Sequence, residues 1–402
     1  MDAWTKLLDE KSDVDIIYFD FQKAFDKVPH VRLLNKLSAY GIKGKVLNWI
    51  REFLNGRKQR VILNGKFSTW DNITSGIPQG SVLGPILFLI YINDLPDVVN
   101  NPIKLFADDT KLYGPSNNEE DRSNIQQDIN HLAQWSHSWQ LNFNKEKCKH
   151  LHLGRVILPD DYRLLDQALG RIEYETDLGV QVDNQLKFQI HINTAVKKAN
   201  RMLGVIKRNF KHLDKESFLH LYKSLVRPHL EYASCAWYTL YKKDAIAIEN
   251  TQRRATKLIN DIRNLSYTER LINLGLPSLE YRRIRADVIQ VYKYMNNLDQ
   301  MSKPLIVKSH ENRTRGNSLK LVKNHCRLDV RKNCFTNRVV NVWNSLPDNV
   351  VTAKSLNSFK SKLNTYWKGQ PIKFEPTCLI PHSEHQRLSR YTGTDLESRS
   401  TR

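Results

Sequence analysis

Acidic residues follow apolar runs at two places in the first third of the sequence. Asp20 ends the run of residues 15–20, and Asp108 and Asp109 follow the run of residues 103–107. A second short apolar run comes next, which predicts a β-hairpin with both carboxylates at its turn. Adjacent aspartates at a turn often do no more than cap their own backbone. This feature alone therefore leaves two interpretations open, turn chemistry and a metal site.

Clustered carboxylates repel one another, and they would repel a polyanionic substrate unless hard cations lay between them. Two Mg²⁺ ions, or Mn²⁺ in their place, held by oxygen ligands would remove both repulsions. Paired ions of this kind activate a 3′-hydroxyl and stabilise a leaving pyrophosphate, and phosphoryl transfer needs little beyond positioning and charge. The acidic points therefore indicate nucleotidyl transfer. They would equally serve phosphodiester hydrolysis in a two-metal nuclease.

The chain is strongly basic, and its charge is unevenly placed. Its 402 residues include 62 Lys and Arg against 42 Asp and Glu, a formal charge of +20 at pH 7. Residues 1–100 are close to neutral, whereas residues 197–227 and 301–340 carry nine and ten basic residues against two acidic ones each. Solvated helix faces account for many Lys-rich segments, but two dense basic blocks in one chain favour a nucleic-acid partner.

Nothing in the sequence indicates secretion or a membrane. The five cysteines are widely spaced and odd in number, which suits a reducing compartment and gives no disulfide framework. No signal peptide opens the chain, and the longest apolar run, residues 85–92, is far shorter than the roughly 20 residues that span a bilayer. We expect a soluble intracellular protein without membrane contact, in either nucleus or cytoplasm, of unknown oligomeric state.

Hydrophobic periodicity and turn residues predict the elements that position the acidic residues. We expect strands over residues 15–20 and 150–153, and a hairpin with Asn64-Gly65 as its turn. The loop of residues 75–85 contains three glycines and two prolines, and Pro85 suits the first turn of an apolar helix. Helices are predicted over residues 86–92, 123–139, 192–210, 215–226 (ending at Pro228), 244–258, 281–295, 335–343 and 355–367.

Four segments carry a resemblance to a known family. They are Asp20-Phe-Gln-Lys-Ala-Phe-Asp26, Ser75-Gly-Ile-Pro-Gln-Gly-Ser81, Phe106-Ala-Asp-Asp109 and Leu141-Asn-Phe-Asn-Lys-Glu-Lys147. In order and spacing they resemble four successive palm motifs of reverse transcriptases, in the form found in non-LTR retrotransposons and jockey-like elements in particular. The palm resemblance covers roughly residues 12–185. Residues 227–237 and 342–347 resemble the thumb and C-terminal region of such proteins.

The resemblance implies roles for individual residues at the centre of the palm. Asp20 and Asp108 match the metal ligands, and Asp109 completes the acidic cluster. The backbone carbonyl of Phe21 would add a further oxygen ligand. Phe25 matches the bulky residue beneath the incoming sugar, where an aromatic ring would exclude a ribose 2′-hydroxyl and so select deoxynucleotides. A core aromatic is the structural alternative for Phe25.

The same resemblance implies contacts to the nucleotide and the duplex. Gln79 and Gly80 match the loop that packs against nucleotide and template, although a plain helix-entry turn is the alternative. Lys147 matches the lysine that approaches the triphosphate and protonates the leaving pyrophosphate, although a surface lysine is the alternative. A basic thumb surface would track the duplex backbone through sequence-independent, salt-sensitive contacts. Its predicted members are Lys197, Lys198, Arg201, Lys207, Arg208 and Lys211.

The fold class implied is an α/β (α+β) polymerase palm, with an antiparallel sheet flanked by helices, followed by an α-helical thumb and a mostly helical C-terminal region. We place the palm at residues 1–188, with the fingers largely missing because only about a dozen residues precede the Asp20 strand. A basic helical thumb at 189–262 and a basic, mostly helical region at 263–370 follow. Residues 371–402 are polar, aromatic-poor and interrupted by proline, which predicts a disordered tail.

The function implied is that of an RNA-directed DNA polymerase of a non-LTR retrotransposon. Such an enzyme adds dNTPs to a primer 3′-hydroxyl on an RNA template, so its partners would be an RNA template, a DNA primer and the RNA–DNA duplex. A catalytically inactive, retroelement-derived protein that only binds nucleic acid is the main alternative, because the fingers region is missing. A two-metal nuclease is a third, but it gives no role to Phe25 or to the Pro78-Gln79-Gly80 loop.

Overall fold

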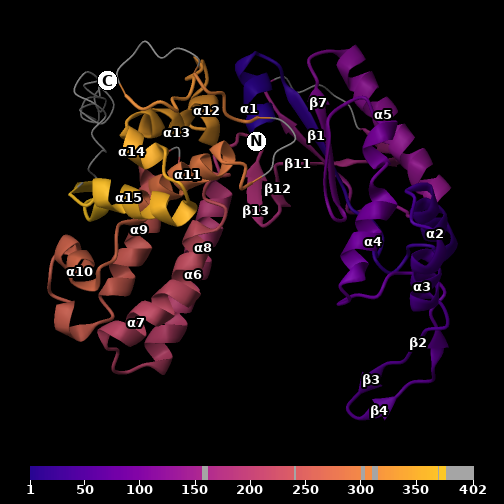
Figure 1. The fold of residues 1–402 in the computed structure, drawn as a ribbon, viewed down its shortest axis with the longest axis horizontal. Coiled ribbons are helices and arrows are strands. Elements are labelled where there is room, and N and C mark those ends of the chain that lie inside the picture. The colour runs from indigo at the N-terminus through magenta and orange to yellow at the C-terminus, as the bar shows by residue number, and fades with distance from the viewer. Residues whose placement is uncertain (156–161, 240, 300–303, 310–315, 370, 377–402) are drawn as a thin grey trace, which may run out of the picture. The chain divides into compact units, whose positions relative to one another are not determined.

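The computed structural model describes residues 1–155, 162–239, 241–299, 304–309, 316–369 and 371–376 (Figure 1). The chain forms two compact units, Glu10–Glu175 and Met1–Asp9 together with Thr176–Arg402. The domain limits placed at residues 188, 262 and 370 stay predictions. The predicted disordered tail, residues 371–402, is wrong at its start, because residues 371–376 are ordered and Ile372 is buried in a hydrophobic core. The rest of the tail, from residue 377 on, lies outside the described residues.

A five-stranded sheet is the centre of the unit Glu10–Glu175. Its strands are β1 (Val14–Phe19), β6 (Ile103–Phe106), β7 (Asp109–Pro115), β8 (Lys149–Leu153) and β11 (Gly170–Ile172), in the order β11-β8-β1-β7-β6. Neighbours are antiparallel except for β11, which runs parallel to β8. The central strand β1 is an apolar run buried on both faces, as such a position requires. The strands predicted at residues 15–20 and 150–153 are therefore confirmed.

Helices cover one face of this sheet, where α2, α4 and α5 lie on the same side in Figure 1. The helices of the unit are α2 (His30–Ala39), α3 (Gly44–Leu54), α4 (Leu83–Ile92) and α5 (Glu119–Trp139), with the short 3₁₀ helix η1 (Leu95–Val98). Ile17 of β1 and Leu112 of β7 belong to one apolar cluster with Phe88 of α4 and Ile129 of α5. This cluster fixes the strand ends that carry the acidic residues.

Short hairpins complete the unit. Strands β3 (Ile62–Leu63) and β4 (Lys66–Phe67) pair antiparallel across Asn64 and Gly65, both at positive φ, so the predicted hairpin turn is confirmed. The other short strands are β2 (Lys58–Gln59), paired with β5 (Asp71–Asn72), and β9 (Arg163–Leu164), paired with β10 (Gln167–Ala168).

The unit that contains Thr176–Arg402 is mainly helical. Strand β12 (Tyr174–Asp177) pairs with β13 (Val180–Asp183), and most of the described residues after β13 lie in helices, apart from the irregular chain between α11 and α12. These are α6 (Gln189–Asn209), α7 (Lys215–Leu221), η2 (Tyr222–Val226), α8 (Arg227–Glu231), α9 (Lys242–Thr256), η3 (Asn260–Ile262), α10 (Tyr267–Leu274), α11 (Leu279–Met295), α12 (Asp329–Lys332), α13 (Phe335–Asn344), α14 (Asp348–Val351), α15 (Leu356–Tyr366) and η4 (Pro371–Lys373). The predicted fold class, a mixed sheet-and-helix unit followed by helices, is confirmed.

One predicted helix end is wrong. The helix that starts at Lys215 does not stop before Pro228 but passes through the π-helical turn η2 into α8. The N–H of Arg227 reaches the carbonyl of Tyr222, five residues back. This wider turn lets Pro228, which has no N–H to donate, enter at the start of α8 without leaving an unpaired donor.

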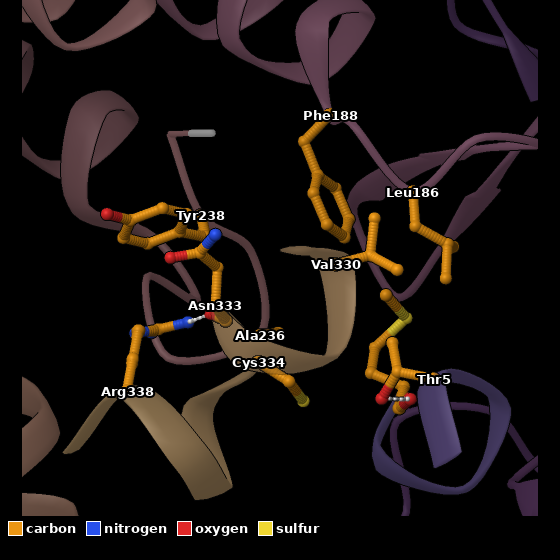
Figure 2. Close-up of a pocket in the computed structure, with 10 residues that line it drawn as sticks. Thr5, Leu186, Phe188, Ala236, Tyr238, Val330, Asn333, Cys334 and Arg338 are labelled. Carbon is orange, nitrogen blue, oxygen red and sulfur yellow. Dashed lines mark hydrogen bonds between the residues drawn. The ribbon is translucent and has the colours of Figure 1, made fainter. Parts of the chain in front are cut away.

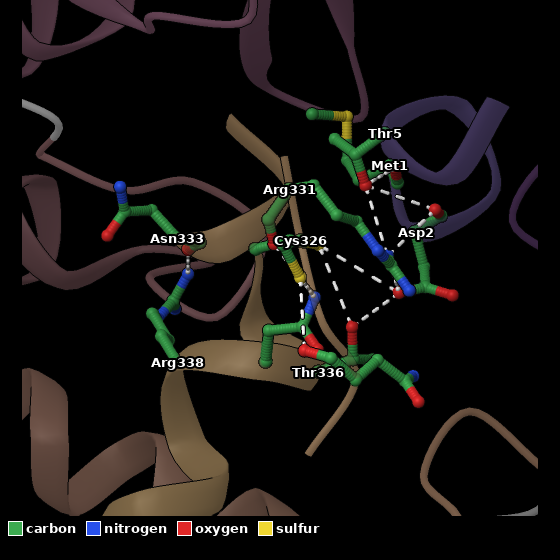
Figure 3. Close-up of polar contacts among 11 residues, drawn as sticks. Met1, Asp2, Thr5, Cys326, Arg331, Asn333, Thr336 and Arg338 are labelled. Carbon is green, nitrogen blue, oxygen red and sulfur yellow. Dashed lines mark hydrogen bonds and ion pairs between the residues drawn. The ribbon is translucent and has the colours of Figure 1, made fainter. Parts of the chain in front are cut away.

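Helix α1 (Asp2–Asp9) packs against α12 and α13 in the same unit (Figure 3). The carboxylate of Asp2 accepts hydrogen bonds from Arg331 of α12 and Thr336 of α13. Asp9 accepts from the backbone N–H of Leu328 at 2.7 Å, just before α12 begins. An acidic residue near the first N–H groups of a helix is favourable, so both ends of α1 hold α12 in place.

A small cavity lies beside these contacts, and Figure 2 shows Phe188, Leu186 and Val330 around it. Its volume is about 30 Å³, room for about two water molecules. It is far too small for a nucleotide.

The cysteines of the described chain, Cys148, Cys235, Cys326 and Cys334, are free thiols. Within the same residues, every helix is too short or too polar to cross a bilayer.

Candidate active site

The two adjacent aspartates lie at a tight hairpin turn, as predicted. Phe106 of β6 pairs with Asp109 of β7, so Ala107 and Asp108 form a two-residue loop between them. Ala107 has φ +50°, the sign that the first residue of a type II′ turn requires. This conformation costs a residue with a Cβ about 1–2 kcal/mol. The strained turn exposes the Asp108 carboxylate at the tip.

The strand register brings Asp20 to this turn. Phe19, the last residue of β1, pairs with Thr110 of β7. Asp20 is the first residue beyond β1, and continuing the antiparallel register by one step would set it opposite Asp109, a position in which Cβ atoms lie about 5 Å apart. Asp20, Asp108 and Asp109, which are distant in sequence, therefore gather at one end of β1 and β7. All three side chains are at least partly exposed.

The chain after β1 is held by the segment that leads into β8. Phe21 forms a bridge with Phe143, and their rings stack at 4.5 Å between centroids. The N–H of Asn144 donates to the carbonyl of Asp20, and the N–H of Gln22 to the carbonyl of Asn142. This pattern makes Phe21 and Phe143 a non-hydrogen-bonded pair. The Phe21 carbonyl consequently faces the other neighbour of β1, the side of the β6–β7 hairpin.

Lys147 reaches the acidic end of β1. Its Nζ lies 3.5 Å from Oδ1 of Asp20, and both side chains are largely exposed to solvent. An exposed pair at this distance is weak, typically below about 1 kcal/mol. Beneath it, burial raises the pKa of the Cys148 thiol to about 11, so this thiol is neutral and packs against the Asp20 carbonyl.

Phe25 is anchored on helix α4. Its ring stacks on Phe88 at 4.5 Å between centroids, with an interplanar angle of 24°. Its backbone carbonyl accepts the N–H of Ile77 at 2.7 Å. Phe25 is half-buried, so part of the residue remains accessible to solvent. Both interpretations made from the sequence, core aromatic and nucleotide contact, are compatible with this placement.

The Gly-rich loop is tied to the segment that follows Phe25. Gln79 Nε2 donates to the Asp26 carboxylate at 3.2 Å, and Ser75 Oγ donates to the Asp26 carbonyl at 3.0 Å. Gly76 has φ +93°, and a Cβ there would lie 2.6 Å from the Asp26 carbonyl oxygen. Gly80 also has positive φ, but open space surrounds it. Gly76 is therefore required for close packing. Asp26, the last residue of the first motif segment, supports the Gly-rich loop, a contact that was not predicted from the sequence.

The predicted basic surface lies in the other unit, on α6 and just beyond it. Its six members are all exposed: Lys197, Lys198, Arg201, Lys207, Arg208 and Lys211. The opposite face of α6 is buried through Ile192, Ala195 and Ala199 among others. Lys197, Arg201 and Arg208 follow the four- and seven-residue spacing that places side chains on one stripe of a helix.

Metal-ligand atoms converge at a different place from the one the sequence indicated. In the part of the chain that the structure describes, one group of three such residues has its ligand atoms within 4.8 Å of one another: Asp15, His150 and His152. The carboxylates of Asp20, Asp108 and Asp109 share one end of the sheet but are not drawn together to that distance. An all-oxygen set made of these carboxylates and the Phe21 carbonyl nevertheless fits Mg²⁺, a hard cation that prefers oxygen ligands.

Comparison with known proteins assigns the family. Residues 5–215 match the family model described as reverse transcriptase (RNA-dependent DNA polymerase). The chain is 27% identical over 265 residues to a probable RNA-directed DNA polymerase from transposon X-element of Drosophila melanogaster, covering 62% of this chain and 29% of that protein. It is 29% identical over 243 residues to the RNA-directed DNA polymerase from mobile element jockey of Drosophila funebris, covering 56% and 26%.

The chain spans less than a third of the length of these relatives. Among solved structures, a telomerase from Candida albicans in complex with a fragment of telomeric RNA aligns with a TM-score of 0.34 at 11% identity, covering 68% of this chain and 53% of that one. The family match takes in all four motif segments and all of α6, and it ends at the start of α7. The chain belongs to the reverse transcriptase family, in the branch found in non-LTR retrotransposons.

Proposed function

We propose that this chain carries the catalytic centre of an RNA-directed DNA polymerase, which adds deoxynucleotides to a primer 3′-hydroxyl on an RNA template. The observation that carries the proposal is the register of β1 and β7, which brings Asp20 beside the Asp108-Asp109 turn. These residues are exposed and acidic in a chain of net charge +20. Exposed carboxylates at a strained turn suit exchangeable cations and substrate better than they suit packing.

Asp20, Asp108 and the Phe21 carbonyl are the groups that would hold two Mg²⁺ ions, with Mn²⁺ as a substitute, and Asp109 adds negative charge beside them. When bound, the ions supply the positive charge that favours ionisation of the 3′-hydroxyl and release of pyrophosphate. Holding the ions and the primer end in register is the contribution of the sheet, because phosphoryl transfer depends chiefly on positioning and charge.

Other residues position the nucleotide in this proposal. The Phe25 ring, fixed against Phe88, lies under the sugar and disfavours a 2′-hydroxyl. Gln79, oriented by Asp26, contacts the base pair being formed. Lys147 exchanges its exposed partner Asp20 for the triphosphate and donates a proton to the leaving pyrophosphate. The exchange costs little because an exposed pair is weak.

Primer extension tests the proposal. The full chain, with an RNA template, a DNA primer and dNTPs, should yield cDNA that depends on Mg²⁺. Asp108→Asn should abolish the product, whereas Asp97→Asn, an exposed acidic residue of η1, should not. Absence of any Mg²⁺-dependent product, or a product unchanged in Asp108→Asn, would contradict the proposal.

A second function, nucleic-acid binding without catalysis, is supported by the exposed basic face of α6. Each phosphate contact made by Lys or Arg contributes a slope of about −0.9 to the dependence of log affinity on log salt. Replacing Lys197, Arg201 and Arg208 by Ala should reduce the slope for an RNA–DNA duplex by about three. Lys242→Ala, Lys243→Ala and Lys257→Ala together, at three exposed lysines around α9, are the matched control.

Binding that survives Asp108→Asn, in a chain that makes no product, would favour this second function over polymerisation. Binding that is equally tight at high and low salt would count against both, because both place the polyanion on α6.

A further inference from the structure

Three side chains of the central sheet converge far from the acidic end of β1. Asp15 pairs directly with His152 across β1 and β8, and Ile17 pairs with His150. Residues two apart on a strand share a face, so Asp15, His150 and His152 all project from the same face. Asp15 lies five residues before Asp20, about 16 Å away along the strand. The convergence is therefore separate from the proposed catalytic carboxylates.

The cluster is buried and close-packed. Asp15 and His150 are 2% and 3% exposed, and His152 is 9% exposed. Oδ1 of Asp15 lies 2.6 Å from Nδ1 of His152 and 3.0 Å from Nε2 of His150. The ligand atoms of the three residues all lie within 4.8 Å of one another. A tetrahedral Zn²⁺ ion with bonds of about 2.0–2.1 Å keeps its ligand atoms about 3.3 Å apart. The two nitrogens, now at hydrogen-bonding distances from Oδ1, would therefore move outward by less than about 1 Å to admit the ion.

Hydrogen bonding alone does not satisfy the cluster. Two imidazole nitrogens approach the same Asp15 oxygen, but only Nδ1 of His152 is aligned to donate to it. Nε2 of His150 is buried without a hydrogen-bond partner, although it points at the cluster from 3.0 Å. A buried polar atom left unpaired costs about 1–3 kcal/mol. A lone pair of this nitrogen directed at a cation accounts for both its position and its lack of a partner.

The surroundings resemble the outer shell of a metal site. The hydroxyl of Tyr162 donates to the other Asp15 oxygen, Oδ2, at 2.7 Å, which fixes the carboxylate plane. The second nitrogen of His152, Nε2, faces the carboxylate of Asp13 at 3.9 Å. Carboxylates behind ligating histidines and hydrogen bonds to ligating carboxylates are typical of zinc sites. The two aspartates together balance the charge of a dication.

We infer that Asp15, His150 and His152 form a binding site for one Zn²⁺ ion, with ligand atoms Oδ1, Nε2 and Nδ1. Binding would replace the hydrogen bond between His152 and Asp15, and the Nδ1 proton of His152 would be released to solvent. The mixed nitrogen and oxygen set suits Zn²⁺ rather than Mg²⁺. The ion would fasten β1 to β8 at the end remote from Asp20, and a water molecule would take the fourth position of the tetrahedron. The burial of the ligands favours a structural role for the ion. The inference does not depend on the proposed polymerase function.

Metal titration of the untagged full chain tests the site. Chain freed of metal with a chelator is titrated with Co²⁺ in excess Mg²⁺, which occupies the all-oxygen sites. One equivalent of Co²⁺ should give the visible absorption of a tetrahedral nitrogen and oxygen site. Zn²⁺ should displace it and raise the melting temperature by roughly 5 °C at a hundredfold excess over Kd. A folded wild-type chain that binds no stoichiometric Co²⁺ or Zn²⁺ would overturn the inference, whatever the variants do.

Variants separate a metal site from a hydrogen-bonded cluster. His150→Gln should lose the equivalent of metal. Tyr162→Phe keeps all three ligands, so it should still bind one equivalent, on the order of tenfold more weakly. His191→Gln, a buried histidine elsewhere, and Cys326→Ser with Cys334→Ser should keep full binding. Loss of the metal in the cysteine variant, or retention in a folded His150→Gln chain, would place the metal elsewhere and overturn the assignment.

Discussion

The two ends of strand β1 hold carboxylates in opposite environments. At one end Asp15 is buried beside His150, His152 and Tyr162. Burial alone would raise the pKa of Asp15, but its contacts with these polar neighbours hold that pKa well below the usual range. At the other end Asp20 is exposed among further carboxylates and one lysine. The difference shows that one strand can contribute both to the stability of the fold and to a reactive site. The buried carboxylate of Asp15 stabilises the folded sheet through its polar neighbours, whereas the exposed carboxylate of Asp20 is accessible to cations and substrate.

Asp20→Asn, at the exposed end of β1, should abolish most of the polymerase activity without reducing the stability of the fold. Loss of a metal-binding carboxylate removes several kcal/mol of charge stabilisation, which corresponds to about a thousandfold drop in primer extension. The melting temperature should stay within about 1 °C of wild type, because the substitution weakens only an exposed ion pair with Lys147. A large fall in melting temperature would show that this end, too, is structural.

Asp15→Asn, at the buried end of β1, should reduce the free energy of unfolding. The substitution leaves buried polar partners without their anion, and breaking such a group costs about 3–5 kcal/mol. Thermal or urea unfolding of the full chain measures the loss. Asp13→Asn, at a more exposed position beside the cluster, should cost much less. Equal and small effects in both variants would contradict the contrast between the two ends.

His191 sharpens the comparison, because it is buried with no carboxylate to support its charge. Burial first, and then the charge of Lys198, lower the pKa of His191 to about 4 from an ordinary 6.5. The unfolded chain therefore binds this proton more readily than the folded one between pH 4 and 6.5. The stability contributed by the neutral ring is present above pH 6.5 and is lost as the pH falls, by about 3 kcal/mol at pH 4.

His191→Gln should flatten this acid dependence, as measured by unfolding at a series of pH values. His220→Gln, at an exposed histidine, should leave the curve unchanged. If both variants follow the wild-type curve, some other group produces the acid sensitivity.

Gly76→Ala tests whether the close backbone contact between Gly76 and Asp26 holds the Gly-rich loop in place beside the proposed active site. The new Cβ would meet the Asp26 carbonyl at 2.6 Å in a left-handed conformation, so we expect a loss of about 2 kcal/mol and a raised KM for dNTPs. Gly80→Ala has a similar φ but open space around it, and it should cost about 1 kcal/mol. Equal losses would mean that φ alone, and not the approach to Asp26, requires the glycine.

Much of the structure around the exposed end of β1 could be predicted from the sequence, because it depends on patterns of neighbouring residues. A run of apolar residues ending in Asp20, two aspartates between apolar runs, and a loop rich in Gly and Pro each indicate structure over a few residues. The hairpins at Asn64-Gly65 and at Asp108 follow from turn chemistry alone. The roles of Phe25, Gln79, Gly80 and Lys147 stay predictions.

The buried end could not be predicted in the same way. Asp15 and His152 are 137 residues apart, so only the strand pairing brings them together. A local signal did exist, since His150 and His152 alternate on a predicted strand and must share a face. The misplaced helix end at Pro228 has a similar cause, because a π turn depends on packing around it and leaves no simple mark in the sequence.

The anchoring of α1 has a consequence for biosynthesis. Asp2 leaves the ribosome well before its partner Arg331, which is 329 residues further along the chain and follows on the order of half a minute later at ordinary rates of synthesis. A helix of eight residues is too short to persist alone in water. The contacts between α1 and Arg331 can therefore form only after Glu10–Glu175 has been synthesised. The long closure that finally seats α1 makes its docking a late, slow step in the maturation of the protein.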